Sequence, residues 1–223
     1  MRKIFEGYEA LFTKRWIRSF LVGLILFSLA IVFQFYASAY AVRVSSGYVN
    51  DIILDNIPAV NLNFIIVEGA LAAIACSIFL LLAKPNYIIF TLKVVAIFIA
   101  TRAVFIAATH SGIPPGQIDP DPTGFFDRIY TDLGLAGGFF FSGHTGLTFL
   151  LALVFWDERF WRYVYFAVSF LFGVSVLLAH VHYSIDVLAA PYIAYAIFKM
   201  AQYLFKEDYA LLGQGSAVAG AAH

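Results

Sequence analysis

Long apolar runs dominate the chain and recur at intervals typical of membrane-spanning helices. The first run carries no charged residue from Ser19 to Val42. A helix needs about 20 apolar residues to cross a bilayer. The runs mix small and aromatic residues without strict alternation, which favours helices over barrel strands. Five further spans are expected, at about residues 63–83, 87–109, 140–156, 164–180 and 186–204.

The composition supports a membrane protein and excludes several other classes. Of the 223 residues, 62% are hydrophobic and only 13% are charged, whereas a soluble domain averages about 25% charged residues. A soluble globular domain, a disordered chain and a disulfide scaffold are therefore excluded. Equal numbers of basic and acidic residues, 14 of each, leave no basic footprint for a nucleic-acid partner. The single cysteine, Cys76, cannot form an intramolecular disulfide.

The distribution of basic residues predicts the orientation of the bundle. With the N-terminus inside, ten basic residues lie on the cytoplasmic side, and only Arg43 and Arg128 lie outside. This is a strong positive-inside bias. We therefore expect an all-α polytopic membrane bundle of six transmembrane helices with both termini cytoplasmic. Residues 17–205 would form the catalytic domain, between a segment at 1–16 and a mobile cytoplasmic tail at 206–223.

The N-terminal region allows two alternatives. Residues 1–16 mix basic and apolar side chains, which suits either a helix on the inner membrane surface or a solvated tail. Ala37-Ser38-Ala39 has the small residues of a signal cleavage site, but the preceding apolar run exceeds the 7–15 residues typical of signal peptides. We interpret the run as a retained span.

A first candidate motif stands at the outer start of the fourth expected span, in Phe139-Phe140-Phe141-Ser142-Gly143-His144-Thr145-Gly146. Ser142 can cap a helix there, and Gly143 would let an anion approach the first-turn N–H groups. His144 would sit beside that anion. The alternative is a plain helix cap with an interfacial histidine.

A second motif, His180-Val181-His182-Tyr183-Ser184-Ile185-Asp186, enters the sixth span. His182 and Asp186 are four residues apart and share one helix face. A carboxylate on Nδ1 would leave Nε2 of His182 as a directed nucleophile or base. The alternative is a structural pair that pins the helix end. Both motifs lie at the outer face, which suggests phosphoryl transfer through a phosphohistidine.

The two motifs resemble the lipid phosphatase/phosphotransferase superfamily, also known as the type 2 phosphatidic acid phosphatases. The sequence is most similar to the sphingomyelin synthase branch, which carries Phe-Ser-Gly-His-Thr and then His-x-His-Tyr-(Thr/Ser)-x-Asp-Val followed by Ala-Tyr. Here these correspond to 141–145, 180–187 and Ala194-Tyr195. Two stretches, from Arg102 through 109–116 and at 51–58, resemble that branch more weakly.

The chain also departs from the ordinary lipid phosphatases. They have a Lys-x6-Arg-Pro element, whereas here Lys93 and Arg102 are nine residues apart and no proline follows. Val176 stands where they place an arginine, six residues before the second histidine. The departures favour the synthase branch over monoester phosphatases and leave the group that neutralises the phosphate undetermined.

The resemblance implies a role for each matching residue. His182 would attack the phosphorus of a phospholipid head group, and Asp186 would orient its ring. His144 would protonate the leaving diacylglycerol oxygen and then activate the acceptor hydroxyl. No cofactor and no metal are expected. A zinc site built from the histidines is a rival hypothesis, but the phosphohistidine mechanism does not need one.

Several further residues are candidates for substrate binding: Ser142, Gly143, Arg102, His180, Tyr183 and Glu68. Arg102 would hold the phosphate or snorkel to the surface. His180 would contact phosphate or only head-group water. Glu68 is an acid within a span and would bond a catalytic histidine or the acceptor, or form a structural pair with Lys93.

The favoured function is transfer of phosphocholine or phosphoethanolamine from a phospholipid donor to a lipid alcohol in the bilayer, ceramide or diacylglycerol. The site would face the bacterial periplasm or a eukaryotic lumen or exterior, and homo-oligomerisation is left open. The runner-up is an outer-face lipid phosphatase, including a polyprenyl diphosphate phosphatase, or a phospholipase C-like hydrolase. A third hypothesis is a transporter or lipid-binding module that uses Glu68, Lys93 and Arg102.

Overall fold

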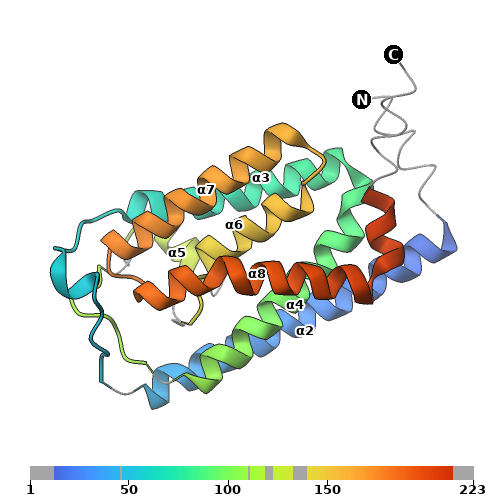
Figure 1. The fold of residues 1–223 in the computed structure, drawn as a ribbon. Coiled ribbons are helices and arrows are strands. Elements are labelled where there is room, and N and C mark those ends of the chain that lie inside the picture. Colours follow the sequence, from blue (N-terminus) through green and yellow to red (C-terminus); the bar gives the residue numbers. More distant parts are fainter. Residues whose placement is uncertain (1–12, 46, 110, 119–122, 133–139, 213–223) are drawn as a thin grey trace.

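The computed structural model describes residues 13–45, 47–109, 111–118, 123–132 and 140–212, and within these ranges every regular element is a helix. The long helices lie side by side as an elongated bundle (Figure 1). In chain order the elements are α2 Lys14–Val44, η1 Leu54–Asn56, η2 Phe64–Glu68, α3 Gly69–Ala83, α4 Pro85–Ala108, α5 Phe125–Asp132, α6 Gly143–Val154, α7 Arg159–Leu178 and α8 Ser184–Leu204.

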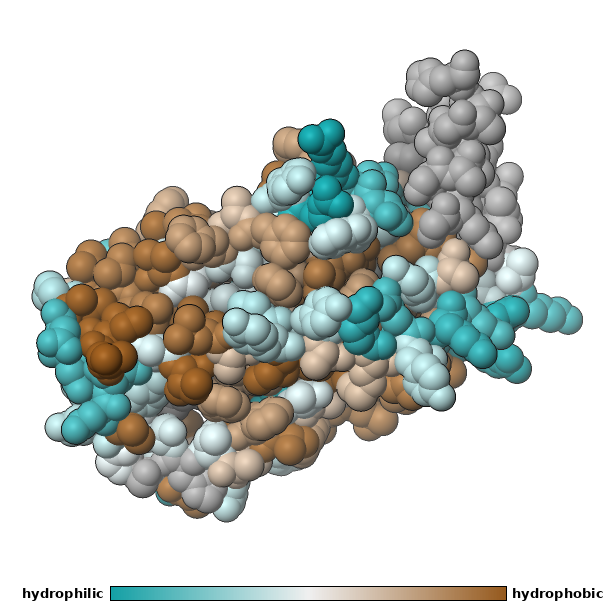
Figure 2. All heavy atoms as spheres, in the orientation of Figure 1, coloured by the Kyte–Doolittle hydropathy of each residue, from teal (hydrophilic) through white to brown (hydrophobic). Residues whose placement is uncertain are grey.

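Five helices among the described residues are long and apolar enough to cross a membrane: α2, the continuous Phe64–Ala83 helix formed by η2 and α3, α4, α7 and α8. They expose large apolar side chains, for example Phe35 at 64%, Phe170 at 75% and Tyr192 at 79%. In Figure 2 hydrophilic residues gather mainly towards the ends of the visible face, and hydrophobic side chains cover much of the surface between. The prediction of an all-helical integral membrane protein is confirmed.

The fourth expected span differs from the prediction. The helix α6 has only 12 residues, about 18 Å of rise, whereas the hydrocarbon core is about 30 Å thick. It packs against α4, α7 and α8, and most of its side chains are buried. The flanking aromatic residues Phe141 and Phe155 are fully buried but lie outside the helix. The apolar run at 140–156 therefore reflects a buried central helix with packed flanks, not a full-length span.

The peripheral helix α2 contacts α4 through a narrow stripe. Its buried residues are Trp16, Gly23, Ala30 and Ala37, each seven positions after the last. Such spacing keeps one seam facing a partner helix, and small residues let two helices approach closely within a bilayer. A Cβ atom on Gly23 would lie 3.2 Å from the Leu92 side chain of α4, so the seam is already closely packed.

Replacing Gly146 by alanine is expected to destabilise the bundle by about 1–3 kcal/mol, the usual cost of overpacking a core. The added Cβ would lie 2.9 Å from the Phe98 ring and 3.4 Å from Ala190, and Phe98 is itself buried. Thermal unfolding in detergent measures the effect. Gly47→Ala is the matched control because a Cβ at Gly47 meets nothing within 4 Å. Equal melting temperatures for the two variants would contradict this packing.

The chain after α8 begins with a helix, whereas the sequence predicted a mobile tail from residue 206 onward. Residues 206–212 are helical, Tyr209 packs on Phe90 and Phe198, and the side chain of Asn86 donates to the carbonyl of Leu212. These seven residues are therefore a packed helix and not the start of a mobile tail. The rest of the expected tail, at 213–223, and most of the N-terminal segment, at 1–12, lie outside the described residues.

Candidate active site

The first motif forms the N-terminus of α6, as its residue types suggest. Ser142 is the N-cap, and its Oγ accepts a hydrogen bond from the backbone N–H of Thr145 at 3.4 Å. The N–H of Ser142 itself donates to the backbone carbonyl of Asp186 at 3.0 Å. That bond joins the two motifs directly, although they are more than 40 residues apart in the sequence. The starts of α6 and α8 are thus held together.

The second motif places His182 just before α8 and Asp186 in the first turn of that helix. Both side chains are buried, and Nδ1 of His182 lies 3.4 Å from Oδ2 of Asp186. The same carboxylate oxygen accepts the N–H of Tyr183 at 3.1 Å, a position at which a helix N-terminus favours negative charge. Within the described residues Nε2 of His182 makes no hydrogen bond. That nitrogen is left for a substrate.

The imidazole rings of His144 and His182 lie close together at the starts of α6 and α8. The two ring centroids are 6.4 Å apart and the planes are inclined by 72°. Nε2 of His144 lies 2.8 Å from the hydroxyl of Tyr130 on α5, and the Phe172 ring of α7 packs edge-on against the imidazole. His144 is therefore held in a defined orientation by two neighbouring helices. Burial raises the pKa of Tyr130, so its hydroxyl keeps its proton at neutral pH.

Arg102 of α4 lies against the start of α6. Its Nε donates to the backbone carbonyl of Phe141 at 3.0 Å, and a Cβ on Gly143 would lie 3.3 Å from the same nitrogen. The guanidinium also interacts electrostatically with Asp186. Gly143 thus makes room for Arg102, whereas the sequence suggested that it makes room for an anion. The structure brings a cation to the point where two helix N-termini meet.

His180 and Tyr183, two candidates for substrate binding, take part in loop contacts. His180 is buried, and its Nδ1 lies 2.7 Å from the carbonyl of Pro115. The Tyr183 hydroxyl donates to the carbonyl of Gly112 at 3.0 Å and accepts the N–H of Val49 at 3.2 Å. Both side chains therefore hold the loop before α8 against the segments that contain Val49, Gly112 and Pro115.

Glu68 is the last residue of the π-helical segment η2 and is half-buried. The suggested pair with Lys93 is wrong, because Lys93 instead pairs with Asp208 at 2.6 Å. Another part of η2 does reach the site, since the backbone of Ile66 interacts with His144. Short π-helical turns occur often at functional sites.

Two residues at this end were not singled out by sequence reasoning, Tyr130 and Asp51. Tyr130 lies on α5, in the connection between α4 and α6, which contains neither of the two histidine motifs. Asp51 accepts hydrogen bonds from the Oγ and N–H of Ser184, at 2.5 and 2.7 Å, and from the N–H groups of Ile53 and Leu54. It therefore joins the connection between α2 and η1 to the start of α8. The only sequence signal for Asp51 was the weak resemblance at 51–58.

Replacing Asp51 by asparagine is expected to destabilise the protein by about 2–3 kcal/mol at neutral pH, since hydrogen bonds to a charged group contribute about 1.5–3 kcal/mol. Burial alone would raise the pKa of Asp51, but the hydrogen bonds from Ser184, Ile53 and Leu54 outweigh it and hold the pKa below its usual value. This stabilisation is complete above the unfolded pKa, about 3.9, and is lost as pH falls through the lower folded pKa.

Melting temperatures in detergent between neutral and strongly acidic pH measure both effects. Asp157→Asn, at an exposed position after α6, is the control and should melt like the wild type. The Asp51 variant should also lose part of the acid-induced drop below about pH 4. An Asp51 variant as stable as the control would show that the carboxylate does not fasten α8.

Chemically, the site combines two histidines, a carboxylate and an arginine. Nε2 of His182 has no hydrogen-bond partner among the described residues, and its Nδ1 contacts Asp186. His144 and Arg102 lie nearby. This set suits a phosphate ester, because an arginine and helix N–H groups bind anions and a histidine forms covalent intermediates. Among the described residues no group of three or more His, Cys, Asp and Glu is arranged to hold a metal ion.

The comparisons with known proteins bear on this region. Residues 137–203 match the family described as "PAP2 superfamily C-terminal". The match includes both motifs and supports the lipid phosphatase/phosphotransferase superfamily, whose members act on phospholipids. An uncharacterized protein of Methanocaldococcus jannaschii is 41% identical over 58 residues, which are 26% of this chain and 24% of the relative. The chain thus matches about a quarter of that protein's length. No solved structure matches.

Proposed function

We propose that this protein is a membrane phosphotransferase that moves a phospholipid head group, phosphocholine or phosphoethanolamine, to the hydroxyl of ceramide or diacylglycerol. The observation that carries the proposal is the pairing of His182 with Asp186, which leaves Nε2 of His182 without a hydrogen bond among the described residues. The ring centroids of His182 and His144 lie 6.4 Å apart. The matched superfamily supports phosphatase or phosphotransferase chemistry. The similarity of the element at 180–187 to the synthase branch favours transfer.

In the first half-reaction Nε2 of His182 attacks the phosphorus and the bond from phosphorus to the diacylglycerol oxygen breaks. Asp186 accepts a hydrogen bond from Nδ1–H, so it stabilises the positive charge that develops on the ring. His144 gives a proton to the departing oxygen. Diacylglycerol leaves, and the head-group phosphate stays bound to His182.

In the second half-reaction His144 removes a proton from the acceptor hydroxyl, the oxygen attacks the phosphorus, and the bond to His182 breaks. Arg102 and the N–H groups at the start of α6 offset the negative charge of the phosphoryl group in both steps. Such positioning and charge stabilisation supply most of the catalysis in phosphoryl transfer. The Tyr130 hydroxyl keeps the His144 ring in place between the steps.

Hydrolysis is the second candidate, because water can replace the lipid alcohol in the same second step. A lipid phosphatase or phospholipase C-like hydrolase would use the same His144, His182 and Asp186. The family match is compatible with both outcomes. The two functions differ in the acceptor alone.

The test incubates purified protein in mixed micelles of phosphatidylcholine and phosphatidylethanolamine, with and without ceramide, and follows the lipids by mass spectrometry. We expect a new phosphosphingolipid and an equal amount of diacylglycerol, both lost in His182→Ala. Diacylglycerol with free phospho-head-group would support the hydrolase instead. An unchanged lipid composition, or turnover that survives in His182→Ala, would overturn the phosphohistidine proposal and favour the transporter or lipid-binding hypothesis.

A further inference from the structure

A polar cavity of about 310 Å³ lies between the start of α2, the first half of α4 and the turn after α8. This is the end of the bundle away from the histidines, since Lys93 lies nine residues before Arg102 on α4. It is lined by four basic and two acidic side chains together with one hydroxyl and three apolar residues: Arg15, Arg18, Lys93, Lys206, Glu207, Asp208, Ser19, Val22, Leu204 and Phe205.

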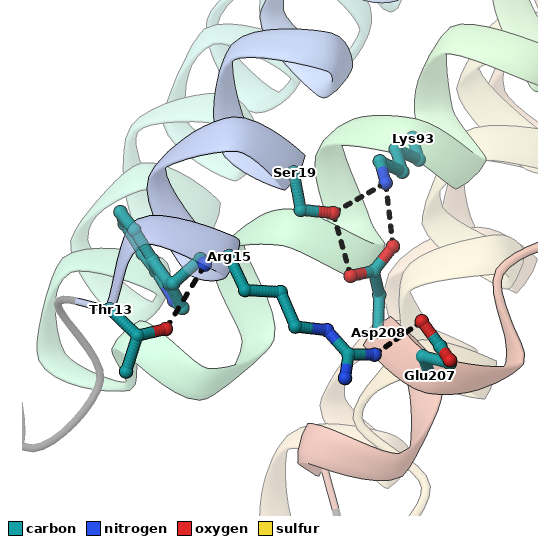
Figure 3. A network of polar contacts seen from close by, with 7 residues as sticks. Thr13, Arg15, Ser19, Lys93, Glu207 and Asp208 are labelled. Atoms are coloured by element: carbon teal, nitrogen blue, oxygen red, sulfur yellow. Dashed lines mark hydrogen bonds and ion pairs between the residues drawn. The ribbon is translucent and has the colours of Figure 1, made fainter.

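The two acids of this cavity are already neutralised by neighbouring cations, as Figure 3 shows. Asp208 accepts Lys93 Nζ at 2.6 Å and the Ser19 hydroxyl at 2.8 Å, and both charged side chains are largely buried. Glu207 pairs with Arg15 at the exposed rim. A buried lysine needs such a partner within a membrane bundle. The role of Asp208 is therefore structural, since it neutralises Lys93.

Arg18 and Lys206 carry the charge that is left over. Both are exposed, and neither forms a hydrogen bond or ion pair within the described chain. They lie on different segments, α2 and the helix at 206–212, yet both line the one cavity. The surplus at the cavity is two positive charges, which suits one phosphate group.

We propose that this cavity binds the phosphate of an anionic phospholipid, with Arg18 and Lys206 as its cationic contacts. Val22 and Leu204 offer an apolar wall beside the charges. The exposed surface of α2 extends this apolar wall with side chains such as Ile25 and Leu29. The acyl chains of the lipid can lie along these side chains. Basic pockets between transmembrane helices bind anionic head groups in this way. The proposal does not depend on the histidine chemistry.

The test measures lipid binding to the purified full chain by native mass spectrometry in a neutral detergent. Phosphatidylglycerol is compared with phosphatidylcholine of the same acyl chains, and inorganic phosphate serves as competitor. The variant Arg18→Gln with Lys206→Gln removes the surplus charge. The control, Arg159→Gln with Lys199→Gln, removes two cations that lie outside the cavity.

We expect phosphatidylglycerol to bind more tightly than phosphatidylcholine, and the cavity variant to weaken that binding roughly tenfold to thirtyfold. The control should change it less than threefold. Competition by inorganic phosphate, lost in the cavity variant, would show that the site recognises the free anion as well as the lipid. Equal losses in both double variants, or no preference for the anionic lipid, would overturn the proposal. Melting temperatures confirm that each variant is folded.

Discussion

Replacing His182 by glutamine is expected to reduce lipid turnover at least a thousandfold, as loss of a catalytic nucleophile does in other enzymes. The amide nitrogen cannot attack phosphorus, so no covalent head-group intermediate forms. The buried pair with Asp186 is replaced by a neutral contact of similar size. Turnover is measured by product formation in mixed micelles, and the intermediate by mass spectrometry of a rapidly quenched, acid-labile phosphohistidine.

The matched comparison is His180→Gln, two residues earlier and also buried. Because the Nδ1 atom of His180 contacts the Pro115 carbonyl, this variant should lose less than tenfold in rate, about the value of one hydrogen bond. It should still form the phosphohistidine intermediate that mass spectrometry detects. A thousandfold loss in His180→Gln with retained activity in His182→Gln would reverse the roles assigned to the two histidines.

Replacing Arg102 by glutamine is expected to lower turnover by about 10² to 10³-fold, the usual effect of removing one group that stabilises charge in the transition state. The guanidinium is the cation that lies at the start of α6, against Gly143 and the Phe141 carbonyl. Glutamine keeps a donor but removes the charge. Steady-state rates at saturating donor lipid measure the effect.

Arg43→Gln is the control for this prediction. Arg43 is exposed in the last turn of α2, where its Nε donates to the carbonyl of Ala39, and its loss should change turnover less than twofold. If Arg102→Gln keeps full activity while the protein is folded, another group must neutralise the phosphate. Arg102→Lys separates the two contributions of the residue, since it restores the charge without the planar fork.

Much of the fold follows from hydropathy because spans are set by bilayer thickness. The first span was expected at Ser19–Val42 and is found within α2, Lys14–Val44, and the third, expected at 87–109, is α4, Pro85–Ala108. The two histidine motifs were also placed correctly at the starts of two helices. Ser142 acts as a cap. His182 lies two residues before α8 and not on one of its faces as expected, but its Nδ1 still reaches the carboxylate of Asp186 in the first turn.

Other features depend on contacts that no local pattern contains. The length of α6 could not be predicted, since Phe141 and Phe155 are as apolar as helix residues but pack outside the helix. Lys93 finds its partner 115 positions later, at Asp208, and hydropathy gives no signal for that choice. Tyr130 belongs to the long connection between α4 and α6, and only the folded chain brings its hydroxyl to His144.

The length of α4 has a consequence for how a donor lipid would reach the proposed active site. Arg102 is 17 residues after Pro85, the first residue of the helix, which corresponds to about 25 Å of rise. For an untilted α4 with Pro85 at one boundary of a hydrocarbon layer about 30 Å thick, the arginine lies within about 5 Å of the other boundary. The glycerol and phosphate of a lipid lie at that depth without any withdrawal of acyl chains. Turnover should accordingly depend on the mole fraction of donor lipid in the micelle. Added detergent should therefore slow the reaction by surface dilution, even when the bulk concentration of donor lipid is constant.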